Sequence, residues 1–243
     1  MFIKNFFRFL AAVVLLPGFA SLGLAADTDK DAGQQTAAPV AKPMPLYKPP
    51  SRGAPASRVG GGTRGLAGDR PTLVVLAPDH TGLTVLEQPT LYWYLSKPAR
   101  MRLEISIIND EAIDPVLEET ISSPKAAGIQ SYNLANNDIK LKTGVEYRWF
   151  VALVPDETQR SNDIIAGGTI MRVNEDPAMK EKLAASKSMS DKAIILAENS
   201  IWYDAIDAIS TAIEEQDSPQ LHEIRAAMLE QVGLKDVAEE DRN

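Results

Sequence analysis

The middle of the chain alternates apolar and polar residues with a period of two. In the segment 101–107, MRLEISI, every odd position is apolar and every even position is polar, and the odd positions of 91–95 and 145–153 form a similar stripe. One apolar face at this period is typical of a half-buried β-strand. Such spacing predicts an antiparallel immunoglobulin- or fibronectin-like β-sandwich over 71–174. Weaker strand patterns, separated by turn residues, occur at 72–77, 115–121, 128–134 and 164–173.

From residue 176 onward the apolar period becomes helical, which predicts a small α-helical hairpin region over 176–243. Ser188 followed by Asp191 resembles a capping pair at a helix start, and Ser218 before Pro219 predicts another start. Part of the region, with Ala205, Ile209 and Ala212, has the spacing of one degenerate tetratricopeptide-like unit. A single unit cannot bury its apolar face, so we expect it to pack on the sandwich or on another protein.

The N-terminus has the layout of a secretory signal peptide over 1–26: basic residues, an apolar run and small residues at a cleavage site after Ala25 or Ala26. Glycine and proline interrupt the apolar run, which favours a cleaved signal over a membrane anchor. Residues 27–70 are rich in proline and glycine and carry a basic stretch, which predicts a disordered linker. A bacterial protein exported to the periplasm or secreted is expected, with no membrane span after signal cleavage.

The overall composition excludes several function classes. A net charge of -8 argues against general nucleic-acid binding, because phosphates favour a basic surface. The chain has no cysteine, so it cannot be a disulfide scaffold and has no thiolate metal ligand or nucleophile.

The aromatic-rich segment 141–153, LKTGVEYRWFVAL, is better explained as sheet interior than as a ligand platform. Tyr147 and Trp149 lie on its apolar face, as Trp93 does on an earlier strand. The spacing of Leu141, Tyr147 and Val151 also resembles the tyrosine corner of fibronectin type III domains, in which a tyrosine bonds to backbone upstream of it.

Five residues outside the core stripe form the candidate interaction surface: Tyr92, Tyr94, Arg148, Phe150 and Tyr203. Tyr92, Tyr94 and Phe150 are the aromatic residues at even positions of the strands, and they either meet another domain or lie open. An exposed aromatic patch would be a binding site. Tyr203 either seals its helix against the sandwich or recognises a partner. If Tyr92 and Tyr94 lie open, alanine there should weaken partner capture and leave the melting temperature nearly unchanged.

The chain offers little catalytic chemistry. Its two histidines, His80 in a turn and His222 on a helix flank, have no zinc-ligand spacing and no nucleophile motif. The adjacent carboxylates of Glu118–Glu119 and Glu214–Glu215 are expected to be surface charge. We therefore predict no catalytic residue, no metal and no cofactor. The alternative, a carbohydrate-active or other hydrolytic enzyme on the same scaffold, requires two convergent carboxylates in a cleft.

Four segments together resemble a bacterial family known only as domain of unknown function 928. They span nearly all of the chain after the signal: 60–65, 82–95, 144–173 and 197–209. The resemblance implies an exported protein and supports the predicted order of elements, but it implies no activity. The expected function is a non-enzymatic module that binds an unknown protein partner or the cell-envelope surface.

Overall fold

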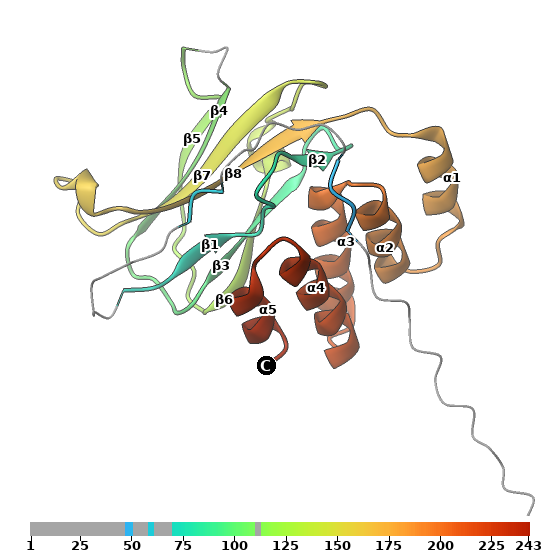
Figure 1. Cartoon of the computed structure of the whole chain (residues 1–243). Coiled ribbons are helices and arrows are strands. Elements are labelled where there is room, and N and C mark those ends of the chain that lie inside the picture. The colour runs from blue at the N-terminus through green and yellow to red at the C-terminus, as the bar shows by residue number, and fades with distance from the viewer. Residues whose placement is uncertain (1–46, 51–57, 61–69, 110–112) are drawn as a thin grey trace, which may run out of the picture. The chain divides into compact units, whose positions relative to one another are not determined.

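The computed structural model describes residues 47–50, 58–60, 70–109 and 113–243 (Figure 1). The predicted signal peptide 1–26 and most of the predicted linker 27–70 lie outside the described residues. Residues Lys42–Asn243 belong to one compact unit, so the strands and helices share a single body. As predicted, the strands come first along the chain and the helices follow.

The strands of the described residues form two sheets. The three-stranded sheet has the order β1 (Leu73–Val75), β3 (Thr90–Leu95) and β6 (Gly128–Asn133). The five-stranded sheet has the order β2 (Gly82–Thr84), β8 (Ile164–Arg172), β7 (Glu146–Val154), β4 (Arg102–Asn109) and β5 (Leu117–Ile121). All pairs are antiparallel except β2 with β8, which is parallel. The sequence pattern located every described strand except β2, for which no strand was predicted.

Residues on the apolar faces of both sheets contribute to one buried hydrophobic cluster. Trp93 on β3 and Trp149 on β7 are both fully buried in it, which agrees with the prediction that these rings are core. Tyr147 is buried as well, and its hydroxyl accepts a hydrogen bond from the backbone N–H of Lys142 at 3.2 Å. This is the upstream contact that the tyrosine spacing predicts.

The helical part consists of α1 (Pro177–Ala185), α2 (Met189–Glu198), α3 (Trp202–Glu215), α4 (Pro219–Gln231) and α5 (Lys235–Asp241). The Ser188 hydroxyl caps α2 by accepting from the N–H of Asp191, as predicted. Pro219 opens α4, but Ser218 makes no side-chain cap bond there. Gly233 follows α4 with a φ of +79°, a conformation that favours glycine and stops the helix.

Helix α3 is attached to the β-strands by polar bonds from consecutive residues at its start. The indole of Trp202 donates to the carbonyl of Leu76 just after β1, at 2.8 Å. Asp204 accepts from the hydroxyl of Thr84 and the N–H of Val85 at the end of β2. These bonds reach the chain just after β1 and the end of β2, so they fix the position of α3 along the β-region.

Parts of the predicted linker are packed on the body. Tyr47 is only 5% exposed and meets Trp202 edge-on, with ring centroids 4.9 Å apart. Arg58 donates to the carbonyls of Ala77 and Val232. The expectation of a linker without packed residues is therefore wrong at these two places, because a buried aromatic ring and a guanidinium with two carbonyl acceptors offset the cost of ordering the chain.

Candidate functional site

The candidate surface predicted from the sequence divides into buried and accessible residues. Tyr92 is only 6% exposed, and its hydroxyl donates to Asp207 Oδ1 on α3 at 2.8 Å. Tyr92 therefore meets another part of the protein and does not lie open to solvent. The covering helix could not be placed from the strand pattern, which only says which side of the sheet Tyr92 occupies.

Tyr203 is also buried, with 2% exposure. Its hydroxyl accepts from the Trp149 indole at 2.9 Å and donates to the carbonyl of Thr169 at 2.9 Å. A side chain held on both sides in this way closes α3 against β7 and β8 and is not available to a partner. Of the two alternatives for Tyr203, the sealing role matches this geometry.

Tyr94 is half-buried on β3. Burial first, and then the negative charge of Glu240 on α5, raises the pKa of its phenol. The carboxylate of Glu240 therefore lies close enough to this ring to act on its pKa. Tyr94 therefore faces the helical part rather than open solvent alone.

Arg148 and Phe150 remain accessible on the outer face of β7, Arg148 exposed and Phe150 half-buried. The Phe150 ring lies over Gly167 of β8, where a Cβ atom would come within 2.4 Å of the ring. Gly167 also pairs with Val59, so the side chain of Val59 lies on the same face. The two adjacent glycines 167 and 168 in a strand pattern were a signal of this close approach.

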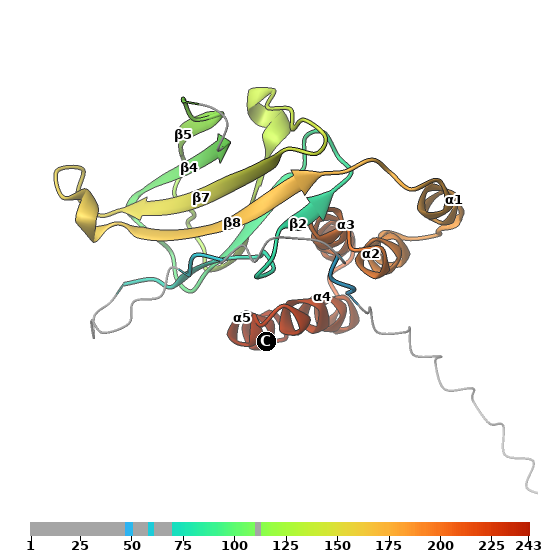
Figure 2. The same cartoon turned by 45° about the horizontal axis from the view of Figure 1, so that its top comes forward.

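Three apolar side chains thus share the outer face, and we call them the outer strip: Val59, Phe150 and Ile165. Val59 is 43% exposed and Ile165 42% exposed, and none of the three belongs to the buried hydrophobic cluster. In Figure 2 the helices lie beside and below β7 and β8. The outer strip is consequently an apolar surface at the border of the sheet, next to the Arg148 guanidinium.

A second feature is an apolar recess of about 300 Å³ between the β2–β3 connection and helices α1 to α3. Leu86, Leu183, Met189 and Leu196 contribute most of its apolar lining, and Asp204 and Asp207 lie in its wall. Burial raises the pKa of the Asp204 carboxyl to about 6. Neither acid was among the predicted site residues, although two aspartates within an apolar helical stripe are a visible signal in the sequence.

The carboxylates of the recess already have partners. Asp204 accepts from Thr84 through one oxygen and from the N–H of Val85 through the other, at 3.0 Å for the latter. Asp207 accepts from Tyr92. Both acids therefore fasten α3 to β2 and β3, and this use accounts for their burial.

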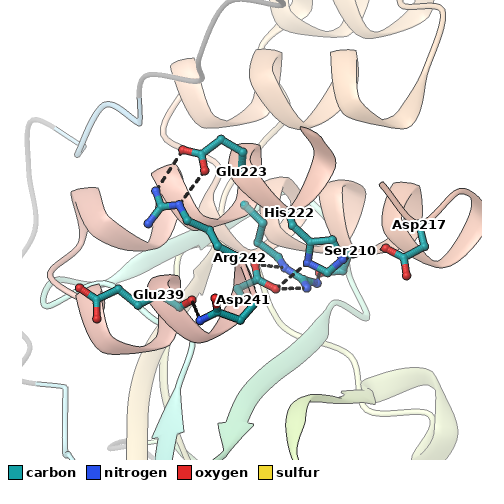
Figure 3. Close-up of polar contacts among 9 residues, drawn as sticks. Ser210, Asp217, His222, Glu223, Glu239, Asp241 and Arg242 are labelled. Atoms are coloured by element: carbon teal, nitrogen blue, oxygen red, sulfur yellow. Dashed lines mark hydrogen bonds and ion pairs between the residues drawn. The ribbon is translucent and has the colours of Figure 1, made fainter. Parts of the chain in front are cut away.

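The two histidines have partners that the sequence did not reveal. His80 stacks on Tyr47, with ring centroids 5.8 Å apart. His222 lies between Asp217 and Asp241, at 2.9 Å and 3.0 Å from its two ring nitrogens (Figure 3). These two neighbours come from the loop before α4 and from the end of α5, so no local spacing around His222 indicates them.

The surroundings of His222 do not form a nucleophilic triad. The serine of this network is Ser210, whose buried hydroxyl accepts a hydrogen bond from Arg225. Arg225 in turn donates to Asp241. The network joins α3, α4 and α5 through a buried ion pair, and structural attachment is the use its bonds support.

The described residues offer neither a metal-binding cluster nor a helix that could cross a membrane. They contain no cluster of three or more histidine or acidic side chains that could hold a metal ion. None of their helices has the length and apolarity that crossing a membrane requires.

Comparison with known proteins identifies the family. No curated protein and no solved structure matches the chain. Residues 59–242 match the family described as Domain of Unknown Function (DUF928), and this range includes every described strand and helix. The match extends over well more than half of the sequence, in agreement with the resemblance carried by its motifs. The chain therefore belongs to the DUF928 family.

Proposed function

We propose that this protein is an exported, non-enzymatic interaction module that binds a protein partner in the bacterial cell envelope through the outer strip. The single observation that carries the proposal is the exposure of Val59 and Ile165 on the sheet border beside Phe150. Large apolar side chains gathered at one border of a sheet favour association, because covering them removes apolar surface from water.

The finer architecture proposed for this module is a fibronectin-like sandwich that carries one tetratricopeptide-like helical pair. The strand orders β1-β3-β6 and β8-β7-β4-β5 support the sandwich, as does the contact of Tyr147 with the backbone of Lys142. Helices α2 and α3 pack against each other, which supports the helical pair. Export rests on the signal-peptide layout of residues 1–26.

Capture from envelope extracts tests the proposal. We expect Ile165→Ser to reduce the captured partner at least about fivefold, because one buried aliphatic side chain at an interface contributes roughly 1–3 kcal/mol. Ile113→Ser is the matched control, since Ile113 is a fully exposed isoleucine on a loop away from the strip. Equal capture by the wild type and both variants, with unchanged melting temperatures, would show that the strip is not the binding surface.

A hydrolytic enzyme is the second candidate, and the recess is the observation that favours it. A carboxyl whose pKa is raised to about 6 can act as a general acid near neutral pH, and Asp207 is a second carboxylate in the same wall. If the protein is an interaction module, the wild type should turn over chromogenic glycosides or esters no faster than the Asp204→Asn variant does. Turnover with an optimum near pH 6 that Asp204→Asn abolishes would favour the enzyme instead.

A further inference from the structure

We infer that the apolar recess beside Asp204 and Asp207 is a binding site for a small ligand with an aliphatic body and one ammonium group. The volume of the recess, about 300 Å³, is at the lower end of the range for small-molecule sites. Every residue that lines it is among those the structure describes, and none belongs to the outer strip. The inference therefore goes beyond the proposed function and does not depend on it.

The lining of the recess suits an aliphatic chain. Leu86 is 44% exposed although its side chain is large and apolar, and Leu183 and Met189 are only half-buried. These three residues come from the β2–β3 connection, from α1 and from the start of α2. They converge on one hollow and leave apolar surface in contact with water there. An aliphatic body that fills the hollow removes this surface from water.

The wall of the recess carries two acids whose partners are all neutral groups. Asp204 and Asp207 lie on the same side of α3, three residues apart. Among the described residues they accept from the hydroxyls of Thr84 and Tyr92 and from the backbone N–H of Val85. Ionised carboxylates that are close together in an apolar wall repel each other and have lost part of their hydration. A cation at this wall offsets both costs.

Asp207 has one oxygen left to accept a hydrogen bond from such a cation. Its Oδ1 accepts from Tyr92 at 2.8 Å, and its Oδ2 has no hydrogen-bond partner in the part of the chain that the structure describes. Burial raises the pKa of the Asp204 carboxyl to about 6, so Asp204 is also mostly ionised at about pH 7.5. An ammonium group would therefore donate to Asp207 Oδ2, and the charge of Asp204 would add to the attraction.

The other charges of the lining do not neutralise the two acids. Lys192 is the only lysine or arginine among the lining residues, and it forms no ion pair with Asp204 or Asp207. Glu175 also lines the recess and pairs with Lys180 at 3.4 Å. The lining thus contains more carboxylates than ammonium groups. This excess of negative charge favours a cationic ligand over a neutral or anionic ligand of the same shape.

Ligands of equal chain length and different charge test the inference. The probes are n-hexylamine, hexanol and hexanoate, titrated at about pH 7.5 into the full-length protein with carbon-13 in its methionine methyl groups. The Met189 methyl signal should shift and saturate with hexylamine, while that of Met101, which does not line the recess, stays unchanged. Hexylamine should bind at least about tenfold more tightly than hexanol, because hydrogen bonds to a charged group are the stronger kind. Hexanoate should bind more weakly than hexanol, since the acids repel it.

Two variants assign the preference for hexylamine to the acids. Asp207→Asn removes the charge and keeps an oxygen that accepts from Tyr92, so the preference over hexanol should fall to about twofold. Its affinity for hexanol should match that of the wild type, which would show that the recess is intact. Glu198→Gln is the matched control, because Glu198 is exposed at the end of α2 and does not line the recess. It removes the same charge from the protein and should keep the full preference.

Three outcomes would overturn the inference. The first is equal binding of hexylamine and hexanol to the wild type, or an equal preference in the wild type and Asp207→Asn. The second is a preference that appears only in Lys192→Gln, since Lys192 itself would then supply the cation. The third is tighter binding of Nα-acetyl-lysine methylamide than of hexylamine, which would assign the recess to a lysine side chain of a protein partner. The outer strip is tested separately through Ile165→Ser, so failure of the recess leaves the proposed function standing.

Discussion

At the scale of single residues, Tyr92 and Tyr203 show what the apolar pattern of a strand or helix cannot predict. A period of two placed Tyr92 correctly on the face opposite Trp93, but which element covers that face depends on α3, more than 100 residues away in the sequence. The same holds for Tyr203, whose helical position was clear while its contacts with Trp149 and Thr169 were not. Long-range partners of this kind have no local signal, so the buried half of the candidate site could not be predicted.

Because Tyr92 is buried, Tyr92→Ala should destabilise the protein. We expect the free energy of unfolding to fall by about 3 kcal/mol, since a large side chain is removed from a packed interface and Asp207 loses its donor. Tyr94→Ala, at a half-buried position on the same strand, is the matched comparison and should cost less. Urea denaturation measures both. A Tyr92→Ala variant as stable as the wild type would mean that Tyr92 is accessible and not part of the packed interior.

Asp204 gives stability a specific dependence on pH. Burial raises the pKa of its carboxyl from 3.8 to about 6, so the folded state binds the proton more tightly than the unfolded state does. The contribution of this group to stability is therefore fully present below about pH 4 and is lost as the pH rises toward about 6. The difference between the two pKa values corresponds to roughly 3 kcal/mol.

In Asp204→Asn this part of the pH dependence should disappear. Melting temperatures between pH 4 and pH 7 measure it, with Asp236→Asn at an exposed position as the control. A wild type and an Asp204→Asn variant with parallel melting profiles would mean that Asp204 does not titrate in this range.

At the scale of elements, the sequence located most strands and helices, and β2 and α1 are the exceptions. Capping residues and apolar stripes fixed α2, α3 and α4, and alternation fixed all long strands. Strand β2 has only three residues, and α1 has a single buried residue, Met179, so neither carries a periodic signal. Of the outer strip, only Phe150 was among the predicted surface residues, together with its neighbour Arg148. Its other members could not be predicted, because Val59 is in a segment expected to be disordered and Ile165 is on a strand that was only weakly indicated.

Helix α5 is held to α4 by one buried and one exposed set of ion pairs, which should differ in their effect on stability. Asp241 accepts from Arg225, and both side chains are almost fully buried. Asp241→Ala leaves Arg225 buried without its carboxylate and should lower the free energy of unfolding by about 3–5 kcal/mol. Arg242→Ala removes the solvent-exposed pairs with Glu223 and Glu230 and should change it little. Chemical denaturation compares the two variants, and an equal loss in both would contradict the distinction.

At the scale of the whole molecule, the bonds of α3 predict that strands and helices unfold together. Trp202, Tyr203, Asp204 and Asp207 reach four different places in the β-region, and residues from both parts share one hydrophobic cluster. Unfolding either part alone would expose to water the apolar side chains that the two parts bury against each other, such as Trp149 and Trp202. We therefore expect a single transition, with the same midpoint from helical circular dichroism and from tryptophan fluorescence. Deletion of residues 176–243 should leave the β-region without a cooperative transition. Two separated midpoints, or a cooperatively folded fragment 58–175, would mean that the helical part is an independent module and that partner binding can be assigned to either part alone.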